Sequence, residues 1–223
     1  MVPQAFTLSL PSGGTVAALL DEPDSPSHAC LVLAHGAGAG MDHPFLAALA
    51  RALVAQGVTV LRYQFPFMQQ GSRRPDPPAL AQATVRAAVQ EAARRCPGQP
   101  LFAGGKSFGA RMSSQAQAAE PLAGVRGLVF VGFPLHPAGK PATSRADHLA
   151  AVNVPMLFLQ GTRDALAELS LVREVVPTLG PRATLHVVDG ADHGFEVLKR
   201  SGRTNEDVIL ELANTAADWM RGF

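Results

Sequence analysis

The sequence has little cysteine and almost no net charge, and each scarcity excludes a class of protein. Among its 223 residues are only two cysteines, Cys30 and Cys96. They have neither a CxxC spacing nor the density of a disulfide framework, so we expect free thiols and no structural zinc site. The 19 basic residues nearly balance the 18 acidic ones. A formal charge of +1 gives no overall field that would attract nucleic acid or an anionic membrane.

Long apolar runs are also missing. No stretch approaches the roughly 20 consecutive apolar residues that a membrane-spanning helix needs. Residues 1–5, Met-Val-Pro-Gln-Ala, do not begin a basic segment followed by the apolar stretch of a signal peptide. We therefore expect a cytoplasmic protein that does not contact membranes, in a reducing compartment that keeps its cysteines as thiols. The oligomeric state is not predicted.

What the sequence does have is the composition of a compact globular protein. Hydrophobic residues make up 47% of the chain and charged residues 17%, which is far from the composition of a disordered chain. This length suffices for one sizeable core but is short for two independent domains. We find no internal repeat and no low-complexity linker. The sequence therefore predicts one domain over residues 1–223.

Strand and helix patterns alternate along the chain after an initial hairpin. Segments 5–10 and 15–20 flank the turn Pro-Ser-Gly-Gly and predict a β-hairpin. Further strands are expected at 31–34, 58–61, 101–103, 125–133, 156–160 and 184–188, and helices at 44–56, 79–95, 107–119, 165–176 and 206–220. This alternation predicts an α/β fold, a doubly wound and mostly parallel sheet with helices on both faces. Because the interval from 131 to 156 is short, we expect no large lid.

A G-x-S-x-G pattern points to Ser107 as a nucleophile. Gly105-Lys106-Ser107-Phe108-Gly109 follows a predicted buried strand and opens a predicted helix, where a sharp turn would expose the serine hydroxyl above the sheet. A helix N-cap is the alternative role for Ser107. The overlapping Gly-Lys-Ser does not complete a phosphate-binding loop, because the opening glycine of that motif would fall at Pro100.

A serine nucleophile needs a base, and His193 has the best position among seven histidines. It lies in the loop directly after the last predicted strand, whereas His186 lies inside that strand and is expected to pack there. The histidine in turn needs an orienting carboxylate, located between serine and histidine in chain order.

Asp164 meets this requirement, since it closes a Gly-containing turn after the 156–160 strand. Its rival Asp192 is too near His193 in sequence to reach the far ring nitrogen easily, and no clear strand precedes Asp147. Asp164 also suits the cap of the helix expected from Ala165, and one carboxylate can do both.

The Gly-rich segment His35-Gly36-Ala37-Gly38 follows a predicted strand and suits an oxyanion hole. We expect the backbone amides of Ala37 and Phe108 to be the donors, with Gly38 as the substitute if the register differs by one. The alternative is that the glycines only make a tight turn. His35, Asp42 and His43 are close in sequence but have no recognised metal-ligand spacing, so we expect no metal and no cofactor.

The chain resembles the α/β-hydrolase superfamily, and in detail its dienelactone-hydrolase-like branch, which includes the eukaryotic testis-expressed and NSL-complex proteins. The stretches that carry the resemblance are residues 35–44, 62–67, 74–78, 104–111, 132–137, 160–164 and 190–193. The resemblance implies a triad of Ser107, Asp164 and His193 and no bound cofactor. Dienelactone hydrolases proper use a cysteine where this chain has Ser107.

Together these features predict an esterase-like serine hydrolase that cleaves a small ester or related acyl compound through an acyl-enzyme intermediate. The alternative is a protein that keeps the fold as a binding or scaffold module without efficient catalysis. Acyl transfer to an acceptor other than water would use the same residues. Lys106, Arg73 and Arg74 either supply positive charge to an anionic substrate or form a solvated loop face.

Overall fold

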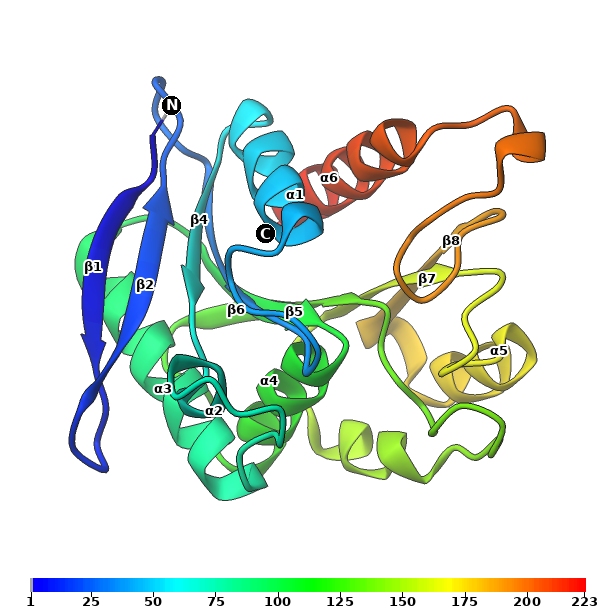
Figure 1. Cartoon of the computed structure of the whole chain (residues 1–223), viewed down its shortest axis with the longest axis horizontal. Helices are drawn as coiled ribbons and strands as arrows, with labels where there is room; N and C mark the ends of the chain where they lie inside the picture. The colour runs from blue at the N-terminus through cyan, green and yellow to red at the C-terminus, as the bar shows by residue number, and fades with distance from the viewer. Residues whose placement is uncertain (1) are drawn as a thin grey trace.

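The strands of the described chain form one mixed sheet in the order β1-β2-β4-β3-β5-β6-β7-β8 (Figure 1). The computed structural model describes residues 2–223. The hairpin strands β1 and β2 pair antiparallel, β2 pairs antiparallel with β4, and the remaining neighbours are parallel. The strand bounds are β1 Gln4–Ser9, β2 Thr15–Asp21, β3 Ala29–Ala34, β4 Val58–Tyr63, β5 Leu101–Lys106, β6 Val125–Val131, β7 Met156–Gly161 and β8 Ala183–Val188.

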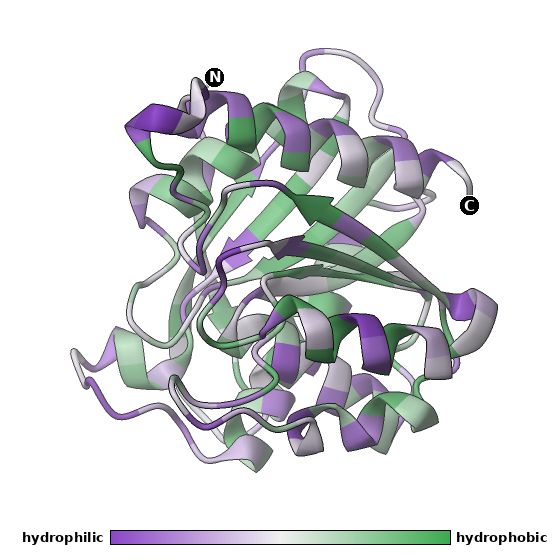
Figure 2. Cartoon of the chain, turned by 90° about the vertical axis from the view of Figure 1, so that its right-hand side faces the viewer, coloured by the Kyte–Doolittle hydropathy of each residue, from purple (hydrophilic) through white to green (hydrophobic). Residues whose placement is uncertain are grey.

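Helices cover both faces of this sheet, as Figure 2 shows, with the hydrophobic strands between two helical layers. The α-helices are α1 Pro44–Ala55, α2 Pro66–Gln69, α3 Pro78–Arg95, α4 Phe108–Ala119, α5 Leu169–Thr178 and α6 Asn205–Arg221. The short 3-10 helices are η1 Ser144–Ala151, η2 Gly180–Arg182 and η3 Lys199–Ser201. This arrangement confirms the predicted doubly wound, mostly parallel fold.

Side-chain alternation along each central strand divides the core in two. Leu31 and Leu33 of β3 belong to a cluster with α1 and α6, whereas Cys30 and Val32 belong to a cluster with α3, α4 and α5. Successive side chains of a strand point to opposite faces, so a strand covered on both sides must be apolar throughout. Every residue of β3 is accordingly buried.

The strand register brings the loops that follow several strands to one edge of the sheet. Ala34, at the end of β3, pairs with Gly105 near the end of β5, and Gly161, at the end of β7, pairs with Val188 at the end of β8. Between them, Lys106 of β5 pairs with Val131 of β6. The residues that follow β3, β5, β7 and β8 are therefore neighbours in space although they are far apart in sequence.

Two elements, α5 and β5, depart most from the bounds that the sequence predicts. The helix expected from Ala165 begins only at Leu169, because Asp164 accepts the amide of Leu166 and holds this segment in a turn. Strand β5 continues to Lys106 through Gly104 and Gly105, although glycine disfavours strands. A Cβ at Gly104 would lie 1.9 Å from the Val129 carbonyl oxygen. The close approach of β5 and β6 therefore requires a residue without a side chain at this position.

The connection between β6 and β7 carries the 3-10 helix η1 and, within the described residues, no α-helical lid. Helix η1 packs on α4. Within residues 2–223 no helix combines the length and the apolar character that a membrane crossing requires.

Candidate active site

Ser107 occupies a strained turn between β5 and α4. Its backbone has φ 52° and ψ −109°, which a non-glycine residue rarely adopts. Strain at a serine between a buried strand and a helix N-terminus holds the hydroxyl out from the sheet. The serine side chain makes no N-cap hydrogen bond to α4. Ser107 is the N-cap residue of α4 by position, but its hydroxyl does not cap the helix and contacts His193 instead.

Gly109, the last glycine of the motif, is required by the close approach of β3. A Cβ at this position would lie 2.6 Å from the Ala34 carbonyl oxygen and 2.7 Å from the His35 carbonyl oxygen. Backbone atoms cannot move aside as a flexible side chain can. The glycine thus allows the first turn of α4 to pack directly against the end of β3, beside the Gly-rich loop.

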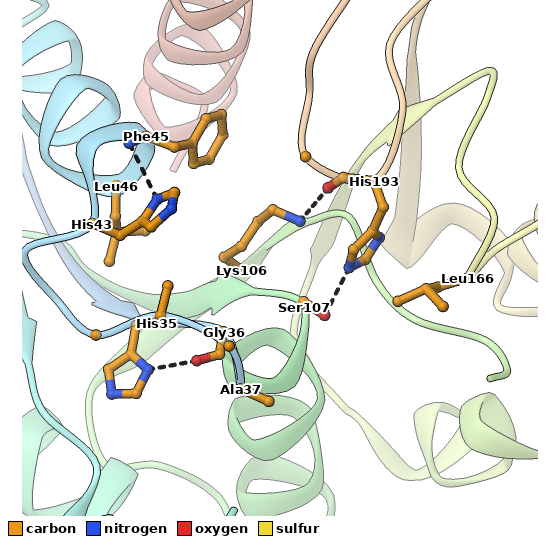
Figure 3. A pocket seen from close by; sticks show the side chains of 14 residues that line it. His35, Gly36, Ala37, His43, Phe45, Leu46, Lys106, Ser107, Leu166 and His193 are labelled. Atoms are coloured by element: carbon orange, nitrogen blue, oxygen red, sulfur yellow. Dashed lines mark hydrogen bonds between the residues drawn. The ribbon is translucent and has the colours of Figure 1, made fainter. Parts of the chain in front are cut away.

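A hydrogen-bonded chain joins the three residues that the sequence singles out. His193 Nε2 lies 2.8 Å from Ser107 Oγ, and His193 Nδ1 lies 2.7 Å from Asp164 Oδ2 (Figure 3 shows the first of these contacts). An ionised carboxylate can only accept, so Nδ1 carries the imidazole proton and Nε2 is left to accept from the serine hydroxyl. That tautomer is the one in which a histidine can take a proton from serine.

Asp164 is fixed by three partners on its two oxygens. Its side chain has no exposed surface, and Oδ1 accepts the Leu166 amide at 2.8 Å. Oδ2, which faces His193, also accepts from Gln160 Nε2 at 2.6 Å. The sequence pattern did not point to this role of Gln160. The available signal for this role was its position: Gln160 is a polar residue near the end of a fully buried strand, four positions before Asp164.

The loop that carries His193 is held from both sides. Lys106 Nζ donates to the His193 carbonyl oxygen at 2.5 Å. The Phe195 ring stacks on Phe45 at 5.7 Å between centroids, with Phe195 itself at φ 63°. Asp192, the rival carboxylate, accepts the amides of Gly194 and Glu196 within its own turn. Asp192 therefore shapes the loop, and Asp164 is the carboxylate that contacts His193.

His35 orients the Gly-rich loop after β3. Its Nε2 accepts the Phe65 amide at 2.9 Å, so Nδ1 carries the proton and donates to the Gly36 carbonyl oxygen at 2.7 Å. The C=O of Gly36 and the N–H of Ala37 belong to one peptide unit and point in opposite directions when the bond is trans. The Ala37 amide therefore points away from the His35 ring.

The two amides predicted to hold an oxyanion are free of other partners. Among the described residues, neither the Ala37 nor the Phe108 amide donates a backbone or side-chain hydrogen bond. Phe108 is the first residue of α4, so its N–H has no partner within the helix. Neither amide is used elsewhere in the described residues, and that the two hold an oxyanion stays a prediction.

Burial lowers the pKa of the His35 imidazole to about 4. An unfolded histidine titrates near about 6.5, so between these values the unfolded chain binds a proton that the folded chain does not. We expect this difference in proton binding to lower the free energy of unfolding by about 1.4 kcal/mol for each pH unit as the pH falls from 6.5 towards 4. Above pH 7 neither the folded nor the unfolded chain binds this proton, so the contribution of His35 to the pH dependence vanishes. Urea unfolding of wild type and His35→Gln across pH 4–8 measures it.

The wild-type curve should be the steeper of the two between pH 4 and 6.5, and the slopes should agree above pH 7. Equal slopes in the acid range would contradict a buried, neutral His35.

A cavity of about 330 Å³ opens beside Ser107. Its lining combines the Gly-rich loop after β3 with side chains from α1, the end of β5 and the loops after β7 and β8. The lining residues are 35–40, His43, Phe45, Leu46, Lys106, Ser107, Leu166, His193 and Gly194. Apolar side chains and glycine backbone dominate, which suits a small organic ligand. Arg73 and Arg74 are exposed before α3 and do not line the cavity.

A second serine–histidine contact lies between α4 and η1. Ser114 Oγ is 2.8 Å from His148 Nε2 and also 2.9 Å from the Arg111 carbonyl oxygen within its own helix. No described carboxylate bonds to the other nitrogen of His148, and the pair does not line the cavity. This contact joins two helices and lacks the third member that orients a general base.

His35 and His43, the histidines close to Asp42 in sequence, make hydrogen bonds to the protein backbone through their ring nitrogens. Both ring nitrogens of His35 have backbone partners, and His43 Nδ1 accepts the Phe45 amide. In residues 2–223 no three His, Cys, Asp or Glu side chains gather closely enough to hold a metal ion. That the site needs no metal or cofactor stays a prediction.

Comparison with known proteins assigns a family to most of the chain. Residues 27–221 match the family described as alpha/beta hydrolase domain. A solved structure of an α/β serine hydrolase without lid, from Xanthomonas campestris, is 25% identical, with a TM-score of 0.75 and 97% of this chain and 94% of that chain covered.

Two further solved structures are similar in fold. A dienelactone hydrolase from Anabaena variabilis is 18% identical, with a TM-score of 0.79 and 99% of this chain and 98% of that chain covered. The esterase domain of a Rhodothermus marinus protein is also 18% identical, with a TM-score of 0.76 and 100% of this chain and 99% of that chain covered.

Proposed function

This chain belongs to the alpha/beta hydrolase family, and on that premise we propose that it is a serine hydrolase that cleaves a small ester or related acyl compound. The observation that carries the proposal is the unbroken hydrogen-bonded chain from Ser107 through His193 to Asp164, at the edge of a small apolar cavity. We also propose membership of the dienelactone-hydrolase-like branch that includes the testis-expressed and NSL-complex proteins, with Ser107 in place of cysteine.

In the proposed first step, Ser107 Oγ bonds to the acyl carbon while its proton moves to His193 Nε2. The acyl oxygen takes up negative charge and accepts hydrogen bonds from the amides of Ala37 and Phe108. Asp164 stabilises the imidazolium that forms and keeps its ring in place. The bond to the leaving alcohol then breaks, and the alcohol takes the proton from His193 Nε2.

The second step returns the enzyme to its starting state. Water attacks the acyl carbon and gives a proton to His193 Nε2, so a second oxyanion forms in the same position. When the bond to Ser107 Oγ breaks, the serine regains its proton and a carboxylic acid leaves. Another acyl acceptor in place of water would make the protein a transferase with the same residues.

A serine-directed fluorophosphonate tests the assembled site without knowledge of the natural substrate. It reacts quickly only with a hydroxyl that has a base beside it and oxyanion donors in front. We expect covalent labelling at Ser107, found by mass spectrometry, and hydrolysis of members of a panel of short- and long-chain p-nitrophenyl esters. A folded protein that labels Ser107 no faster than its surface serines, and cleaves no ester, would favour the binding or scaffold alternative.

A further inference from the structure

Lys106 connects the end of β5 with the loop that carries His193. Its ammonium donates to the His193 carbonyl oxygen at 2.5 Å, a contact that Figure 3 shows as a dashed line. The same ammonium lies 5.3 Å from the centroid of the Phe195 ring, a distance at which an aromatic face attracts a cation. Lys106 directly precedes Ser107, so one backbone segment carries the candidate nucleophile and also holds the main chain of the candidate base.

The bare side of Gly132, the residue after β6, leaves room for this ammonium beside Asp164. Gly132 has φ 68°, and a Cβ built on it would lie 3.2 Å from Lys106 Nζ and 3.6 Å from Asp164 Oδ2. Both atoms therefore border the same small space. Burial lowers the pKa of Lys106 to about 8, and the nearby charges of Asp164 and Asp192 oppose that shift. At pH 7 the group is therefore mainly an ammonium.

Asp164 needs a counter-charge that its hydrogen-bond partners do not provide. These partners are the Leu166 amide, the Gln160 side chain and His193 Nδ1, and all are neutral when the imidazole is ready to accept a proton. A fully buried carboxylate with neutral partners draws a proton onto the adjacent imidazole, because the resulting ion pair costs less than a buried charge without a counter-charge. The Lys106 ammonium is a cation that borders this carboxylate.

We propose that Lys106 is a positioning residue: its ammonium fixes the main chain of His193, and its charge beside Asp164 allows this carboxylate to be ionised while the imidazole stays neutral. The inference rests on the proposed hydrolase function, in which a neutral His193 takes the proton of Ser107. In this role Lys106 acts through His193 and Asp164 and needs no contact with the substrate. Removal of its charge leaves the imidazolium as the counter-charge of Asp164, so the pKa of His193 rises.

Other titratable groups lie at the same edge of the sheet. Asp192 and Glu196 belong to the His193 loop, and Asp192 Oδ1 accepts two amides of its own turn. His35 lies in the Gly-rich loop, and His43 lies at the start of α1. These groups are present in every Lys106 variant, so a change confined to the His193 titration measures the effect of Lys106.

The test measures the His193 titration directly and does not require turnover. Two-dimensional NMR of the histidine Cε1–H groups follows each imidazole as the pH is varied, and the signal that is missing in His193→Gln identifies His193. Lys106→Met introduces a neutral side chain of similar length. In this variant we expect His193 to titrate at a pH higher than in wild type by about half a pH unit or more. Lys106→Arg keeps the charge and should titrate close to wild type.

Kinetics with a p-nitrophenyl ester give the second measurement. Lys106→Met should lower kcat by about 10- to 100-fold, with a smaller effect on KM, because the His193 main chain loses its donor. The acid limb of kcat/KM should move to higher pH together with the NMR titration. Lys140→Met is the matched control, because Lys140 is an exposed lysine in the connection between β6 and β7. It should leave both measurements unchanged.

If Lys106→Met does not fold, Asp164→Asn and wild type provide the comparison. The chain has three lysines, Lys106, Lys140 and Lys199, so NMR of protein with ¹³C-labelled lysine can follow each amine. The pKa of Lys106 should be lower in Asp164→Asn than in wild type, because the attraction of the carboxylate is lost. An unchanged Lys106 titration would mean that the two charges do not interact, and the inference would be overturned.

The outcomes separate this inference from the proposed function. If wild type cleaves no ester and fluorophosphonate does not label Ser107, the proposed function fails, and the inference fails with it. If wild type is active but His193 titrates at the same pH in Lys106→Met, or if Lys106→Arg raises that pH as far as Lys106→Met does, the inference is overturned while the hydrolase stands. A higher titration pH in Lys106→Met alone supports it.

Discussion

Ser107→Ala is expected to lower kcat/KM for any ester that the protein cleaves by about 10⁴- to 10⁶-fold, and to abolish fluorophosphonate labelling. The reason is that Oγ is both the attacking atom and the group that His193 Nε2 contacts at 2.8 Å. His193→Ala should have a similar effect, because the hydroxyl then has no base. The double variant should be little worse than either single one, since the residues act as a unit.

Steady-state kinetics and mass spectrometry of the labelled protein measure these losses, and circular dichroism shows whether each variant is folded. Ser114→Ala is the matched control, because Ser114 also contacts a histidine but lies between α4 and η1. It should retain activity near that of wild type. Full activity in folded Ser107→Ala, or loss of activity in Ser114→Ala alone, would identify a different nucleophile.

Asp164→Asn is expected to lower kcat by about 10⁴-fold while the protein remains folded. The carboxylate is fully buried and accepts from His193 Nδ1 at 2.7 Å, which fixes the proton on that nitrogen. An amide at this position can donate to Nδ1, which leaves the proton on Nε2, where it blocks acceptance from Ser107. The oxyanion donors remain, so slow residual turnover is expected.

Asp147→Asn provides the control, since Asp147 is an exposed aspartate in η1. Its kcat should equal that of wild type. Kinetics for both variants, with thermal unfolding to confirm a cooperative transition, make the comparison. A folded Asp164→Asn protein with nearly wild-type kcat would mean that His193 does not depend on this carboxylate for its tautomer.

The layered architecture and the three residues of the hydrogen-bonded chain could be predicted from the amino-acid sequence alone. Apolar runs of strand length that alternate with helical periodicity depend on local spacing, so they can be read without long-range information. The strand–Ser107–helix context likewise lies within a few residues. Asp164 and His193 were found because each follows a strand, and the residues after parallel strands meet at one edge of a sheet.

The hydrogen-bond partners of these residues could not be predicted in this way, because they depend on the tertiary structure. His193 and Ser107 are 86 positions apart, and their contact depends on the register of β5 to β8 and on the loop that Lys106 and Phe195 hold. The support of Asp164 by Gln160, and the later start of α5, depend on side-chain directions and on competition between a turn and a helix. Such choices follow from packing across the fold, which the local spacing of residue types does not encode.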